Sequence, residues 1–62
     1  MNRTIAHKQV DGISICLKAS NVRGKTMYTA IASTSQAFLY VTCTYERYFA
    51  LKVYNDLVKY LL

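Results

Sequence analysis

The chain has 62 residues, of which 53% are hydrophobic, and its formal net charge is +5. This length allows one small domain over residues 1–62, and the hydrophobic fraction is too high for a disordered segment. Its apolar stretches are much shorter than the ~20 residues that cross a bilayer, and no signal peptide is recognisable, so we expect a cytoplasmic protein without membrane contact.

The chain contains two cysteines, Cys16 and Cys43, and a single histidine, His7. These are too few ligands for a structural zinc site, and we expect neither a metal nor a cofactor. The strands predicted below place the two cysteines on opposite faces of a sheet, which argues against a disulfide and favours free thiols in a reducing compartment. A domain this small then gains additional burial most simply by forming a homodimer.

The first third of the chain predicts a hairpin. Residues 3–9 are expected to form a short polar edge strand, and Asp11-Gly12 is typical of a two-residue type I′ turn. Residues 13–20 then alternate apolar and polar side chains with the period of a half-buried strand. Residues 21–24 predict a second turn, in which Gly24 supplies the left-handed conformation.

Two further strands and a helix complete the prediction. Residues 25–32 and 38–45 have strand composition, with a loop over 33–36 between them. A long helix from Ser35 onward is the alternative, but Val41, Thr42 and Thr44 disfavour it. Residues 47–62 predict a helix with Thr44 as its N-cap and Glu46 in its first turn. We therefore expect an α+β fold, with a three- or four-stranded antiparallel sheet packed against one C-terminal helix.

The predicted C-terminal helix has an unusually wide apolar face. Its polar side chains form one narrow stripe of Lys52, Asn55, Asp56 and Lys59, and the remaining arc covers roughly 200° instead of about 100°. Such a helix is expected to contact two surfaces, one in its own chain and one in a partner. The candidate partner-binding residues are Leu51, Tyr54, Leu57, Val58 and Leu61.

The positive charge lies mainly in the strand region, because residues 1–31 contain five of the eight Lys and Arg residues. This distribution favours an anionic partner, although simple solvation of the lysines remains the alternative. The candidate contacts on the sheet and turns are Arg3, Lys8, Lys18, Arg23 and Lys25 for phosphates, with Tyr28 and Tyr40 on the sheet face opposite the helix. Lys18, Tyr28, Tyr40 and Thr42 are expected together on that outer face.

Two motifs suggest chemistry, and both have a simpler interpretation. Residues 19–26 fit a relaxed phosphate-loop pattern that ends in Lys25-Thr26, but a strand and not a helix is predicted to follow it. A Cys-His pair would have to form in space, from His7 with Cys16 or Cys43, and 62 residues leave little scaffold for a pocket that excludes water. We expect no enzyme and no small-molecule substrate.

Two functions remain as hypotheses. The first is a non-enzymatic protein-interaction module that self-associates or binds and modulates a larger protein, as an accessory protein or inhibitor. In size and composition it is similar to accessory proteins of phages and mobile elements. The second is a nucleic-acid-binding protein that uses a basic antiparallel sheet and hairpin turn. In topology the predicted fold resembles the three-strand-plus-helix DNA-binding domains at the start of phage integrases, which implies a sheet that enters the major groove.

Overall fold

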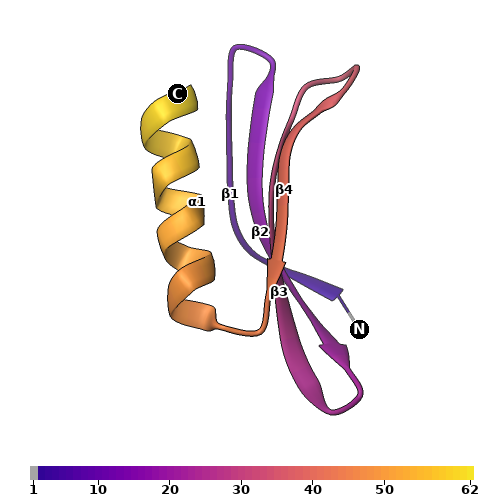
Figure 1. Ribbon diagram of the computed structural model, residues 1–62. Coiled ribbons are helices and arrows are strands. Elements are labelled where there is room, and N and C mark those ends of the chain that lie inside the picture. Colours follow the sequence, from indigo (N-terminus) through magenta and orange to yellow (C-terminus); the bar gives the residue numbers. More distant parts are fainter. Residues whose placement is uncertain (1) are drawn as a thin grey trace.

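The computed structural model, which describes residues 2–62, contains one antiparallel sheet and one helix (Figure 1). The strands are β1 (Asn2–Val10), β2 (Ile13–Val22), β3 (Lys25–Ser33) and β4 (Phe38–Thr44), and the helix is α1 (Arg47–Leu61). The strands are paired in chain order, β1-β2-β3-β4, so that β1 and β4 form the two edges of the sheet. Since α1 packs mainly on β2 and β3, the predicted α+β fold with a C-terminal helix is confirmed.

Both tight turns between the first three strands have the same backbone geometry. Asp11 and Gly12 have φ values of 52° and 82°, and Arg23 and Gly24 have 52° and 80°. Positive φ at both central residues defines a type I′ hairpin, whose twist matches that of the flanking strands. The second turn is tighter than predicted, because Val22 and Lys25 are already paired strand residues. Its loop is held by the side-chain oxygen of Asn21, which accepts a 3.0 Å hydrogen bond from the amide of Gly24.

The strand register decides which side chains lie under the helix. Leu17 is opposite Ala6 on one side and Ala30 on the other, so these residues share the face on which α1 packs. Ala50 of the helix is fully buried against Leu17 and Ala30, and the small alanine side chains allow the helix to approach the sheet closely.

The same register corrects the predicted outer face. Tyr28 is opposite Ala19, Tyr40 is opposite Ala32 and Thr42 is opposite Ala30. All three therefore lie on the helix-bearing face of the sheet, and of the four residues expected on the outer face only Lys18 is there. The prediction failed because β3 has apolar side chains on both faces, so alternation alone does not identify the inner one.

The two cysteines lie on the same face of the sheet, which also corrects the prediction. Cys16 is opposite Ile31, and Cys43 is opposite Thr29, whose hydroxyl oxygen lies 3.5 Å from the Cys43 sulfur. Because β3 separates their strands, the two cysteines are about 10 Å apart across the sheet, beyond the reach of a disulfide. Both are free thiols.

The hydrophobic core is very small. Among residues 2–62 the buried hydrophobic side chains are Ile15, Leu17, Ala19, Ala30, Ala32 and Ala50, and only the first two of these are large. Partly buried residues of β1, β3 and α1 surround them. A core of this size gives a marginally stable monomer, because a short chain buries a low fraction of its surface.

The start of the helix differs from the prediction in its cap. Glu46 is the N-cap, and it makes no side-chain hydrogen bond to the first turn. The hydroxyl of Thr44 instead accepts a 3.0 Å hydrogen bond from the amide of Glu46, so it stabilises the turn that leads into α1. Within residues 2–62, α1 is too short and too polar to cross a membrane.

Candidate interaction surface

The exposed apolar side chains are concentrated in one stretch of the chain. Ten large hydrophobic residues of the described range 2–62 are exposed, and seven of them lie from Phe38 to Phe49. We call these seven the β4–α1 apolar surface: Phe38, Leu39, Tyr40, Val41, Tyr45, Tyr48 and Phe49. Phe38 and Tyr48 are the most exposed of them, at 73% and 80%. By the strand register Phe38 and Val41 lie on the outer face of the sheet and Tyr40 lies on the helix-bearing face, so the exposed apolar side chains of β4 flank its free edge on both sides.

Strand β4 contributes the first four residues of this surface and is an open edge. It pairs with β3 on one side only, and it contains no charged residue. Its pairing is irregular near its start, because Ala32 is opposite Tyr40 whereas Ser33 is opposite Phe38, which leaves Leu39 as the extra residue of a bulge. From Tyr40 to Thr44 the pairing with β3 is regular.

The predicted partner-binding face of the helix is covered largely by the sheet of the same chain. Leu51, Tyr54 and Leu57 pack against the core cluster, while Val58 and Leu61 are half-buried. The exposed aromatic residues of α1 are Tyr48, Phe49 and Tyr60, and none of them belongs to the predicted partner-binding face. An available sequence signal was the stretch 26–45, twenty residues without a charge in a basic chain, although this stretch includes β3 as well as β4.

The predicted basic residues divide into groups. Arg3, Arg23 and Lys25 lie toward the end of the sheet that carries the β2–β3 turn, the end at which α1 also begins. Lys18 is opposite Thr4 on the outer face. Lys8 is opposite Ile15, toward the other end of the sheet. The structure therefore brings three of the five predicted phosphate contacts to one end of the molecule.

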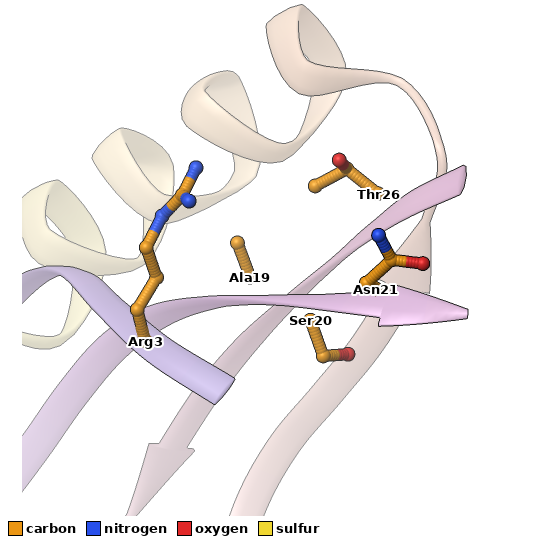
Figure 2. A pocket seen from close by; sticks show the side chains of 5 residues that line it. All are labelled: Arg3, Ala19, Ser20, Asn21 and Thr26. Carbon is orange, nitrogen blue, oxygen red and sulfur yellow. The ribbon is translucent and has the colours of Figure 1, made fainter. Parts of the chain in front are cut away.

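A small hollow lies beside these basic residues (Figure 2). Arg3, Ala19, Ser20, Asn21 and Thr26 line a volume of about 230 Å³. The side chains of Arg3, Ala19 and Thr26 point to the side of the sheet on which the helix lies, and Ser20 points away from it. This volume is below that of typical small-molecule pockets, so the hollow is better suited to a surface contact than to enclosing a ligand. Thr26 belongs to β3, so the phosphate-loop motif forms a hairpin and does not lead into a helix.

The outer face carries all three residues considered for a Cys-His pair, His7, Cys16 and Cys43. His7 is directly opposite Cys16 on neighbouring strands. The Nε2 atom of His7, however, lies 3.0 Å from the hydroxyl of Ser14, so the ring is hydrogen-bonded along the sheet surface. His7 and Cys16 border a shallow depression with Thr4, Lys18, Ile31, Ser33 and Phe38. Among the described residues, no three His, Cys, Asp or Glu side chains gather where they could hold a metal ion.

Comparison with known protein families, with curated proteins and with solved structures finds no match to this chain.

Proposed function

We propose that this protein is a non-enzymatic interaction module that associates through the β4–α1 apolar surface. The observation that carries the proposal is the concentration of seven of the ten exposed large hydrophobic residues between Phe38 and Phe49. Exposed apolar side chains on both sides of an uncovered edge strand, together with those at the start of the following helix, are suited to contact with another protein.

Energetics support association. Fully burying one large apolar side chain contributes roughly 1.5–3 kcal/mol, and the chain buries only two such side chains completely in its own core. Covering even part of the β4–α1 apolar surface would therefore add apolar burial comparable to that of the monomer core. Self-association, or the binding and modulation of a larger protein, would provide this burial.

A cytoplasmic setting fits this function. Cys16 and Cys43 are free thiols, and Cys43 is exposed. Exposed unpaired thiols persist more readily in a reducing compartment than in an oxidising one.

The experiment is a measurement of molar mass by light scattering and sedimentation velocity, over micromolar to millimolar protein concentrations. We expect the mass to rise above the chain mass of 7.1 kDa with concentration. A variant that combines Phe38→Ser, Tyr48→Ser and Phe49→Ser should remain monomeric. The matched control is Tyr60→Ser, which removes an aromatic ring of 76% exposure outside the surface and should still associate. A wild-type chain that stays monomeric and behaves like the triple variant would refute self-association through this surface.

Nucleic-acid binding is the second candidate, and the grouping of Arg3, Arg23 and Lys25 at one end of the sheet favours it. The polar side chains of Ser20, Asn21 and Thr26 lie beside them, and such groups commonly contact phosphate oxygens. Binding of this kind should weaken with salt, with a log–log slope near −0.9 for each neutralised phosphate.

The test of this second candidate reverses the charges of the β2–β3 turn. Arg23→Glu with Lys25→Glu should abolish binding to double-stranded DNA and RNA and leave any dimer intact. Lys8→Glu with Lys59→Glu is the matched control, because it changes the net charge equally but toward the other end of the molecule (Figure 1). Equal losses in both variants would mean that net charge and not the turn drives binding.

A further inference from the structure

We infer that β4 pairs in antiparallel orientation with β4 of a second copy, so that the two four-stranded sheets become one continuous sheet. This inference rests on the proposed function and specifies its partner and geometry. It begins from the edge of β4 that faces away from β3. That edge presents a row of backbone N–H and C=O groups with no strand beside it.

The composition of β4 suits pairing with another strand. Its seven residues, FLYVTCT, include aromatic and β-branched residues and neither proline nor any charged residue. Natural sheets usually protect their edges with charges, prolines, strong bulges or covering segments, and an edge without such protection is a template for strand addition. The bulge at Leu39 affects only the start of β4, and the regular segment from Tyr40 to Thr44 remains available.

The lack of charge in β4 makes this edge the place where a second copy can approach with the least repulsion. Two chains of net charge +5 repel each other, and association is least opposed where no cations face one another. A β4–β4 pair meets this condition along its whole length. Pairing through the opposite edge would not, because β1 carries Arg3 and Lys8. Unlike a partner with an unrelated edge, a second copy necessarily supplies a strand of the same length and the same uncharged composition.

Symmetry provides a further argument. An antiparallel pair of identical strands is related by a two-fold axis, so the contact is self-complementary and closes at two copies. The antiparallel arrangement also places the start of one β4 beside the end of the other. Phe38 of each copy then lies near Tyr45 of the other, and both residues are more than half exposed in the monomer. The pairing thus covers side chains of the β4–α1 apolar surface as well as backbone groups.

The test compares lysine substitutions on the two edges. Val41→Lys changes an exposed outer-face residue of β4, and Gln9→Lys changes an exposed outer-face residue of β1. Both variants add one positive charge to an edge strand. We expect Val41→Lys to raise the dimer dissociation constant on the order of 100-fold, because it introduces like charges into the interface, and Gln9→Lys to leave it nearly unchanged. Circular dichroism confirms that each variant is folded.

Hydrogen exchange of the wild-type protein provides a second measurement that needs no variant. Amides of β4 that point away from β3 should become protected as the protein concentration rises, while those on the free edge of β1 should not. Association that leaves β4 unprotected and that Val41→Lys does not weaken would overturn the β4 pairing, yet it would leave the proposed interaction module standing. A wild-type chain that is monomeric at every concentration would overturn self-association itself.

Discussion

The two edge strands of the sheet differ most clearly in their charge and in the apolar character of their exposed side chains. Strand β1 carries Arg3, His7 and Lys8 and has an irregularity in its pairing with β2 between Thr4 and Ala6. Strand β4 has no charge, and its run from Phe38 to Val41 is exposed. Natural sheets use edge charges and bulges to prevent uncontrolled association. The contrast indicates that one edge is protected and the other is available for a partner.

This asymmetry has a consequence for assembly. A sheet with two available edges would add copies at both sides and grow without limit, whereas a sheet with one available edge closes as a dimer. The cations of β1 therefore matter for the proposed contact on β4, although two strands, β2 and β3, lie between β1 and β4.

The largest effect on stability is expected from a substitution in the core that supports both edge strands. Leu17 is completely buried under the helix, between the two edge strands. Leu17→Ala should lower the free energy of unfolding by about 3 kcal/mol, because it removes buried methyl groups and leaves a cavity. For a marginally stable chain this loss should abolish the folded monomer, and it should expose β1 and β4 together. Chemical denaturation followed by circular dichroism measures the change.

The matched control for this prediction is Lys18→Ala, at the adjacent exposed position on the outer face. It should change the stability by less than about 0.5 kcal/mol. A Leu17→Ala protein with wild-type stability would mean that the two edges do not depend on this core.

The second prediction removes the protection of β1. Arg3→Thr with Lys8→Thr leaves His7 as the single ionisable side chain of that strand. If charge is what keeps β1 unpaired, both edges become available, and light scattering should detect species larger than a dimer. Lys52→Thr with Lys59→Thr on α1 lowers the net charge equally and should remain dimeric. Larger species in both variants would attribute the effect to net charge and not to the edge.

The sequence was sufficient to predict the order of the elements. The Asp11-Gly12 turn, the alternation over residues 13–20 and the amphipathic pattern after Arg47 each rest on local chemistry, and each is found in the structure. Predictions that depended on register were less successful. Tyr28 and Tyr40 lie on the helix-bearing face because the helix packs over the small side chains of Ala30 and Ala32. Nothing local in β3 distinguishes that face from the one that carries Met27 and Ile31.

The predicted partner-binding residues of α1 differ from those of the proposed β4–α1 apolar surface for a similar reason. The wide apolar arc of α1 suggested a partner because the sequence does not show how much of the arc one sheet can cover. In the structure Leu51, Tyr54 and Leu57 pack against the core of their own chain, and the uncovered apolar side chains lie in β4 and the start of α1. The absence of charge in β4 is visible in the sequence, but its meaning depends on β4 being an edge, which only the strand order reveals.

The smallest expected effect concerns the stability of β1, and it tests whether this strand unfolds together with the rest of the sheet. Gly12 lies in the turn of the β1–β2 hairpin with φ +82°, and Gly24 lies in the turn of the β2–β3 hairpin with φ +80°. A Cβ atom built at either position would have no other heavy atom within 4 Å. The methyl group that either substitution adds therefore contacts no neighbour, and each substitution should lower the free energy of unfolding by about 1 kcal/mol because alanine disfavours the left-handed backbone. Equal losses of unfolding free energy would show that β1 unfolds together with the rest of the sheet. Most of β1 is exposed, and only Ile5 and Ala6 are half-buried. A clearly smaller loss for Gly12→Ala would mean that β1 frays independently, so that its cations protect an edge that is itself mobile.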